Sequence, residues 1–130
     1  MSCKPIFLSN EDGKNVIQVL MCDEKESFSC CGKPMKELKP NTTDGATEKH
    51  KPVIEVNGNE VTVKVGSIFH PMTEEHSIGW IYLQTARGGQ HVYLTPNHDP
   101  VATFCVPEGD TPLAAFAFCN LHGFWKTDLQ

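Results

Sequence analysis

The chain has 130 residues, of which 39% are hydrophobic and 21% charged, and its formal net charge is -5. These values fit one globular domain with room for a small appendage. The negative charge argues against nucleic acid as a partner, and no apolar run approaches the roughly 20 residues that span a membrane.

The first block, residues 1–38, holds four of the six cysteines: Cys3, Cys22, Cys30 and Cys31. The N-terminus has no apolar signal core, so we do not expect export. Cysteines without such a signal favour a reducing compartment, and we expect a cytoplasmic protein. Residues 16–20 predict a short strand, with residues 28–31 as its partner. A block this small cannot bury much core by itself.

From residue 39 onward the sequence predicts a β domain. Residues 39–51 read as a loop. Two hairpins follow, with turns at Asn57-Gly58 and at residues 87–89. Further strands are expected at residues 101–106 and 114–118, and the latter is taken as the last. Short strands at this spacing suggest an antiparallel β-sandwich, and no long amphipathic helix is visible.

Histidines and one cysteine form the strongest chemical signal. The expected ligands stand at the ends of strands, where loops can converge: His50, His70, His76, Cys119 and His122. Their spacing alone leaves a shared metal and ordinary loop histidines equally open, whereas His91 and His98 are interpreted as ordinary side chains. Imidazoles with one thiolate exceed the four ligands of a structural zinc site and favour iron with one open position.

Three motifs together resemble the superoxide reductase family, also called desulfoferrodoxin or neelaredoxin. They are Glu-Lys-His-x-Pro at residues 48–52, His-Pro-Met-Thr-x2-His-x2-Gly-Trp at residues 70–80 and Cys-Asn-Leu-His-Gly-x-Trp at residues 119–125. The resemblance covers roughly residues 46 to 126. It implies an all-β, immunoglobulin-like, seven-stranded antiparallel β-sandwich.

The resemblance also implies one mononuclear non-haem iron per chain. Cys119 is its axial ligand, and the ligands in the plane are His50, His70, His76 and His122. Backbone N–H groups of Leu121 and His122 would bond the Cys119 sulfur. The two tryptophans of the motifs, Trp80 and Trp125, would either wall the site or belong to the core.

The implied reaction is the one-electron reduction of superoxide to hydrogen peroxide. The cation of Lys49 would attract superoxide and stabilise the developing peroxide, and Glu48 would ligate the oxidised iron. Without the motif, both residues read as a solvated charged loop. The family further implies electrons from rubredoxin or a similar small carrier, and a homodimer or homotetramer.

The N-terminal block resembles the desulforedoxin-like module of many family members, whose iron is held by four cysteines. Its vicinal pair matches Cys30 and Cys31, but its first Cys-x-x-Cys is missing at residues 9–13. We therefore predict a degenerate module without iron over residues 1–38, followed by an iron-binding β-sandwich domain over residues 39–130. A rearranged site of Cys3, Cys22, Cys30 and Cys31, or disulfide chemistry, stays open.

Two other functions fit part of the pattern. A cupredoxin-like electron-transfer protein uses two histidines, a cysteine and a weak methionine, but here no methionine follows His122 and the histidines are too many. A structural zinc domain that binds a partner is the other alternative. Zinc would leave the protein colourless, whereas ferric thiolate should absorb in the visible.

Overall fold

The computed structural model describes residues 5–23 and 27–129. The chain divides into two compact units, Met1–Lys39 and Pro40–Gln130. No helix among the described residues is long and apolar enough to cross a membrane.

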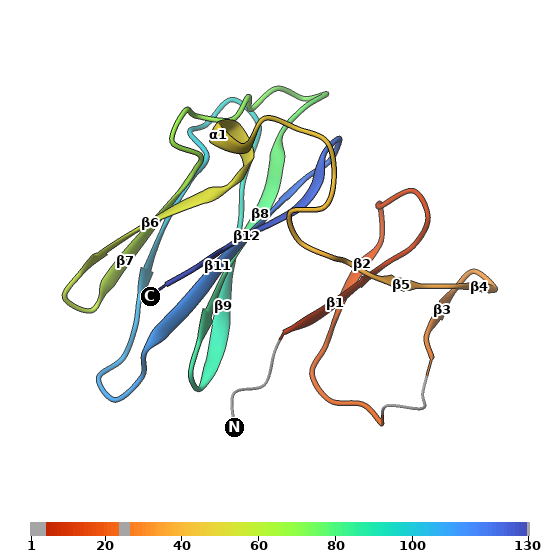
Figure 1. The fold of residues 1–130 in the computed structure, drawn as a ribbon, viewed down its shortest axis with the longest axis horizontal. Helices are drawn as coiled ribbons and strands as arrows, with labels where there is room; N and C mark the ends of the chain where they lie inside the picture. The colour runs from red at the N-terminus through yellow and green to blue at the C-terminus, as the bar shows by residue number, and fades with distance from the viewer. Residues whose placement is uncertain (1–4, 24–26, 130) are drawn as a thin grey trace. The chain divides into compact units, whose positions relative to one another are not determined.

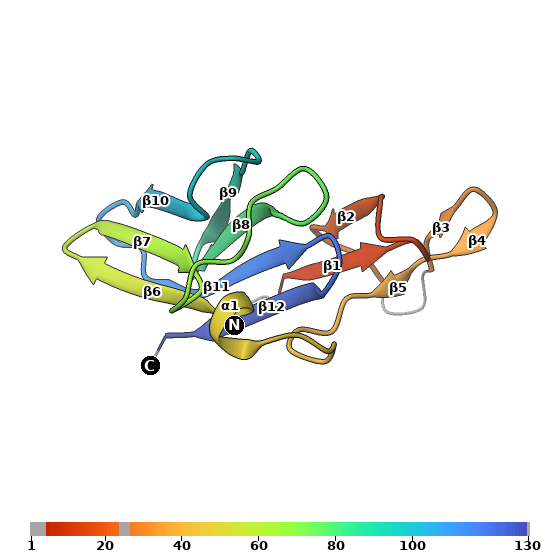
Figure 2. The ribbon, with the colours of Figure 1, turned by 90° about the horizontal axis from the view of Figure 1, so that it is seen from above.

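The second unit consists of two antiparallel sheets. The three-stranded sheet has the order β10-β7-β6, and the four-stranded sheet has the order β12-β11-β8-β9 (Figures 1 and 2). The strands are β6 (Pro52–Asn57), β7 (Glu60–Val65), β8 (Ile78–Thr85), β9 (Gly88–Tyr93), β10 (Val101–Cys105), β11 (Pro112–Cys119) and β12 (Gly123–Asp128). This confirms the predicted seven-stranded β-sandwich.

The first hairpin of the sandwich follows directly from its sequence. Asn57 pairs with Glu60 across a two-residue turn in which Gly58 has φ 64°. Beyond the turn, alternate side chains of β7 point inward, and Val61, Val63 and Val65 are fully buried. They pack in one core with inward side chains of β8 and β11.

The strand β12 is absent from the sequence prediction. It pairs with β11 along its whole length, from Ala114 opposite Asp128 to Cys119 opposite Gly123. Cys119 and His122 therefore do not lie in a loop after the last strand, as the sequence suggested. Cys119 ends β11, and His122 lies in the tight turn of a hairpin. The strand was missed because Phe124 and Trp125 are both buried, so its hydrophobic pattern does not alternate.

The pairing of β11 with β8 changes register between Phe118 and Cys119. Phe118 is opposite Trp80, but Cys119 is opposite Ile78, so Gly79 is left over in β8. Such a bulge turns the following side chains relative to the sheet. Cys119 and Ile78, which pair beside this bulge, are both fully buried.

The described part of the first unit contains short strands only. One sheet has the order β2-β1-β5, from β1 (Ile6–Ser9), β2 (Val16–Val19) and β5 (Lys36–Glu37). A separate hairpin pairs β3 (Ser29–Cys30) with β4 (Lys33–Pro34).

The pairing predicted for the first unit was wrong. The strand expected at residues 16–20 is present as β2, but its partner is β1 and not residues 28–31. The latter residues fold back on β4, because Cys31 (φ 53°) and Gly32 (φ 78°) adopt the left-handed conformations of a tight hairpin turn.

Candidate metal centre

Four ligand-type side chains meet at one end of the sandwich. The ligand atoms of His50, His70, His76 and Cys119 all lie within 4.8 Å of one another. His50 ends the short helix α1 (Thr47–His50), and Cys119 ends β11. His70 and His76 lie in the segment between β7 and β8. The sequence motifs are therefore brought together by strand ends and by one helical turn.

Backbone carbonyls fix the protonation of two of these rings. The Nδ1 atom of His50 lies 2.7 Å from the carbonyl oxygen of Ala46, and the Nδ1 atom of His70 lies 2.6 Å from the carbonyl oxygen of Pro71. A carbonyl oxygen can only accept, so each Nδ1 carries the proton and donates it. The neutral ring then presents an unprotonated Nε2, the form that binds a metal.

The unprotonated nitrogens of His50 and His70 face each other. Their Nε2 atoms are 3.1 Å apart, and the Nε2 atom of His70 is also 3.3 Å from the Cys119 sulfur. Two lone pairs at this distance repel unless a cation lies between them. Burial also lowers the pKa of His70 to about 4, so protonation does not relieve the contact at neutral pH. The donor set thus fits a metal ion.

His76 adds a second sign of a missing ligand. Its Nε2 atom is buried and has no hydrogen-bond partner among the described residues. A buried polar atom without a partner is costly and rare in native proteins. Burial lowers the pKa of His76, and the charges of His122, His50 and Lys49 act in the same direction. A neutral ring with a free nitrogen again suits a metal.

His122 stands beside this group. Its ring centroid is 4.8 Å from that of His50 and 5.3 Å from that of His76. Its Nδ1 atom donates to the oxygen of Asp44 at 2.8 Å. The structure therefore brings all five predicted ligands into one neighbourhood, with four ligand atoms converging.

Trp125 walls this neighbourhood. Its ring stacks on His50 with centroids 5.0 Å apart, and its Nε1 donates to the oxygen of His122 at 3.0 Å. Trp80 instead stacks on Phe118, with centroids 5.6 Å apart. Trp125 is therefore in direct contact with two candidate ligands.

The sulfur of Cys119 is buried but receives backbone donors. Burial raises the pKa of the thiol, and N–H groups of Leu121 and His122 oppose that rise. The N–H of His122 lies 3.4 Å from the sulfur. A hydrogen-bonded thiolate next to a metal is stabilised by such donors.

Lys49 and Glu48 are both exposed residues of α1. Burial is the main cause of the lowered pKa of both His50 and His76. The charge of Lys49 lowers the pKa of each further, whereas the charge of Glu48 opposes the lowering at His50. Among the described residues Lys49 has no ion-pair partner. Its cation is thus available at the site, and Glu48 lines an open hollow with Lys51 and Ser67.

The N-terminal cysteines do not join a comparable group within the described residues. Cys22 and Cys31 are exposed thiols, and Cys30 is half-buried. Cys3 lies outside the described residues, so the four-cysteine alternative stays an open prediction.

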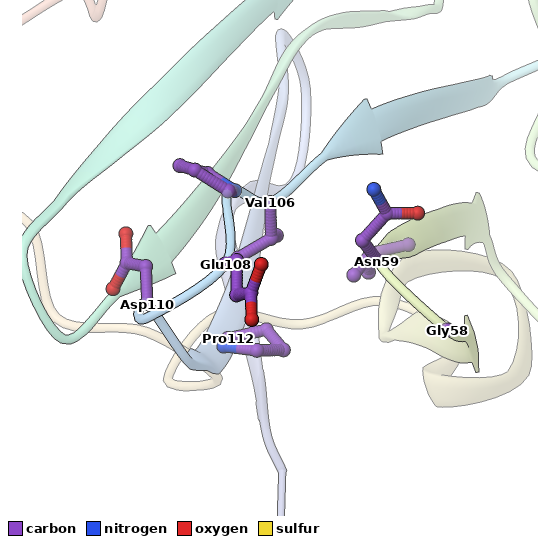
Figure 3. A pocket seen from close by; sticks show the side chains of 8 residues that line it. Gly58, Asn59, Val106, Glu108, Asp110 and Pro112 are labelled. Atoms are coloured by element: carbon purple, nitrogen blue, oxygen red, sulfur yellow. The ribbon is translucent and has the colours of Figure 1, made fainter.

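A separate hollow of about 380 Å³ lies between the β6–β7 turn and the segment that follows β10 (Figure 3). Glu108, Asp110 and Asn59 supply its polar side chains. Asp110 accepts from the N–H groups of Arg87 and Thr111, so its carboxylate serves the local turn. The hollow has no histidine or cysteine and is not part of the metal centre.

Sequence prediction missed the groups that orient the ligands. The carbonyls of Ala46, Pro71 and Asp44 belong to the backbone and have no residue signature. The sequence indicated Gly45 only as a turn residue, and not that a Cβ there would lie 3.1 Å from Cε1 of His50.

Comparison with known proteins finds a matching family model and several similar proteins. A family model described as Desulfoferrodoxin matches residues 42–128. The chain is 43% identical over 114 residues to a desulfoferrodoxin of Nitratidesulfovibrio vulgaris, with 88% of each chain covered. It is 36% identical over 104 residues to a superoxide reductase of Pyrococcus horikoshii, covering 67% of this chain and 90% of that one.

A solved structure is similar over nearly the whole chain. The superoxide reductase of Treponema pallidum superposes with a TM-score of 0.84 at 38% identity, covering 96% of this chain and 99% of that one.

Proposed function

The chain belongs to the desulfoferrodoxin family of superoxide reductases, and from this we propose that it reduces superoxide to hydrogen peroxide at one iron centre. The family makes the chain an oxidoreductase. The convergence of unprotonated histidine nitrogens on a buried cysteine is the observation that carries the proposal.

The iron would be held by five side chains of the second unit: His50, His70, His76, His122 and Cys119. When bound, iron supplies the single electron and an open position for a small anion. The imidazoles of His50, His70 and His122 suit it because each donates its Nδ1 proton to a backbone carbonyl. The thiolate is a soft donor that favours iron over magnesium or calcium.

Lys49 has the role of attracting and holding the substrate. Superoxide is an anion, and the chain as a whole carries a charge of -5. An unpaired cation beside the centre concentrates the anion locally and stabilises the added negative charge of peroxide. Glu48 is proposed as a carboxylate that ligates oxidised iron after the product leaves.

The remaining parts of the proposal concern partners and organisation. Residues 39–130 form the iron-binding domain, and residues 1–38 form a degenerate desulforedoxin-like module without iron. An iron centre that gives up one electron in each turnover must then be reduced again, and we propose a rubredoxin-like small carrier as its electron donor. We propose a homo-oligomer, dimer or tetramer, in the cytoplasm.

Replacing Cys119 tests the centre most directly. The oxidised wild-type protein should absorb strongly in the visible as ferric thiolate, and a mild reductant should bleach it. Cys119→Ser should lose this band and most superoxide reduction, measured by pulse radiolysis. Cys105→Ser is the matched control, because Cys105 is an exposed thiol on β10. A colourless oxidised protein with bound zinc would overturn the proposal.

A further inference from the structure

The side chain of Asn120 links the two segments that carry His76 and Cys119. Its Oδ1 accepts from the N–H of Ser77 at 3.1 Å, and its Nδ2 donates to the oxygen of Glu75 at 2.8 Å. Its own backbone N–H donates to the oxygen of Ser77 at 3.3 Å. Asn120 thus forms hydrogen bonds to both chain neighbours of His76. Because Asn120 directly follows Cys119, these bonds connect the two candidate ligands.

His76 depends on its backbone more than the other candidate ligands do. The rings of His50, His70 and His122 are each oriented by a carbonyl that accepts from Nδ1. The described residues offer the ring of His76 no such contact, and its Nε2 is without a partner. The direction of this ring therefore follows from where its main chain is held.

A local turn alone does not provide that hold. Thr73 and His76 exchange backbone and hydroxyl hydrogen bonds, with the N–H of Thr73 2.9 Å from the oxygen of His76 and the N–H of His76 3.0 Å from the Thr73 hydroxyl. These contacts shape residues 73–76 within one segment. Only a contact to another segment, such as that of Asn120, relates the turn to the end of β11.

We propose that Asn120 is a positioning residue that sets His76 against Cys119 in the metal centre. It touches neither the metal nor the substrate. Its side-chain amide carries both a donor and an acceptor, so it can bond at the same time to the carbonyl before His76 and to the N–H after it. The inference deepens the proposed function and rests on it.

A role in positioning differs measurably from a role in stability alone. The contacts of Asn120 are exposed, so water replaces them readily and the metal-free fold should lose little. Groups that orient metal ligands, in contrast, typically change metal affinity about 10- to 100-fold when removed. Metal affinity and melting temperature should therefore respond differently to the same substitution.

The test compares three variants of the full chain without metal and with Fe²⁺ under anaerobic conditions. Asn120→Ala removes both side-chain contacts. Asn120→Asp keeps the acceptor for Ser77 but places a carboxylate against the oxygen of Glu75. Gln90→Ala is the control, because its amide also bridges two segments, with Nε2 2.7 Å from the oxygen of Cys105 on β10.

We expect both Asn120 variants to bind Fe²⁺ about tenfold or more weakly in competition with a chelator. Their ferric thiolate band should shift, and the metal-free melting temperature should fall no further than in Gln90→Ala. Gln90→Ala should bind Fe²⁺ like the wild type. If the Asn120 variants bind Fe²⁺ with an affinity within twofold of the wild type and their ferric thiolate band is unshifted, the inference about Asn120 is wrong, but the proposed function stands. A wild-type chain that binds no Fe²⁺ overturns the proposed function as well.

Discussion

At the scale of single residues, the proposed role of Lys49 is to attract an anion to a chain whose net charge of -5 repels it. Lys49 is exposed and unpaired among the described residues, while acidic side chains outnumber basic ones by 16 to 11. At physiological salt the field of a distant charge is screened within about 8 Å. The cation nearest the site therefore dominates what an approaching anion experiences there.

The substitution Lys49→Ala should slow the capture of superoxide by roughly tenfold, within the range that local steering provides. The rate should also depend less on ionic strength, while the ferric thiolate band persists because no ligand is lost. Pulse radiolysis at several salt concentrations measures both effects.

Lys64→Ala is the matched control for this experiment. It removes the same charge from the chain, but Lys64 lies on β7 and pairs with Glu55 at 3.2 Å. Its capture rate should stay close to that of the wild type. Equal losses in the two variants would assign the effect to net charge and would contradict a local role for Lys49.

Sequence reasoning identified the candidate ligand side chains but not the backbone groups that orient them. The spacings around His70, His76 and Cys119 carry recognisable motifs, so their meeting could be predicted. The carbonyls that accept from Nδ1 are present in every residue, and only the folded chain decides which ones are used. Asn120 likewise stands in a recognisable motif, but its two partners are backbone groups of Glu75 and Ser77, which the sequence does not reveal.

At the scale of elements, the centre is built where hairpins and one helical turn end. The β6–β7 hairpin was predictable because Asn57-Gly58 and the alternation of Val61, Val63 and Val65 agree. The β11–β12 hairpin was not, because Phe124 and Trp125 are buried in succession. Its turn carries His122, so the missed strand is also the one that fixes a candidate ligand.

The loop before α1 approaches this centre closely at Gly45. A Cβ at Gly45 would lie 3.1 Å from Cε1 of His50 and 3.3 Å from Cβ of His122. Both contacts are tighter than ordinary packing, so one ring must move. Gly45→Ala should therefore weaken Fe²⁺ binding about tenfold, as displaced ligand support commonly does.

Gly58→Ala separates this effect from backbone strain. Gly58 has φ 64°, and a Cβ there meets nothing within 4 Å. The substitution should cost about 1 kcal/mol in the free energy of unfolding and leave Fe²⁺ affinity unchanged. Chelator competition and thermal melting of both variants make the comparison. An unchanged affinity in Gly45→Ala would show that the loop yields instead of the rings.

At the scale of the whole molecule, the candidate ligands tie together segments that are far apart in the chain. His50, His70 and Cys119 come from α1, from the β7–β8 segment and from β11. An ion that binds these groups only when they are assembled stabilises the folded state by mass action. The second unit should therefore melt at a temperature that depends on metal.

Removing the metal should lower this melting temperature by roughly 10 to 20 °C, because free Fe²⁺ at about 100 times its dissociation constant contributes about 2.7 kcal/mol. Calorimetry with and without a chelator measures the change. Cys119→Ser, which lacks the soft ligand, should respond much less to the chelator. If the chelator lowered the melting temperature of Cys119→Ser as much as that of the wild type, the stabilising ion would have to bind at another site.

The number of iron atoms per chain decides what the first unit does. Cys30 ends β3, Cys31 lies in the turn to β4, and Cys22 is exposed, but the described residues of the first unit hold no group of three metal-ligand side chains. Four thiolates are needed for an iron site of the desulforedoxin kind, and the motif that would supply the first pair is absent from residues 9–13.

We therefore expect metal analysis of the anaerobically loaded chain to give one iron per chain. The double variant Cys30→Ser with Cys31→Ser should keep that iron, its visible band and the rate of superoxide reduction, because all proposed ligands lie in the second unit. Two irons in the wild type and one in the double variant would instead mean that Cys30 and Cys31 recruit other thiolates. The first unit would then be a redox module that supplies electrons within the same chain.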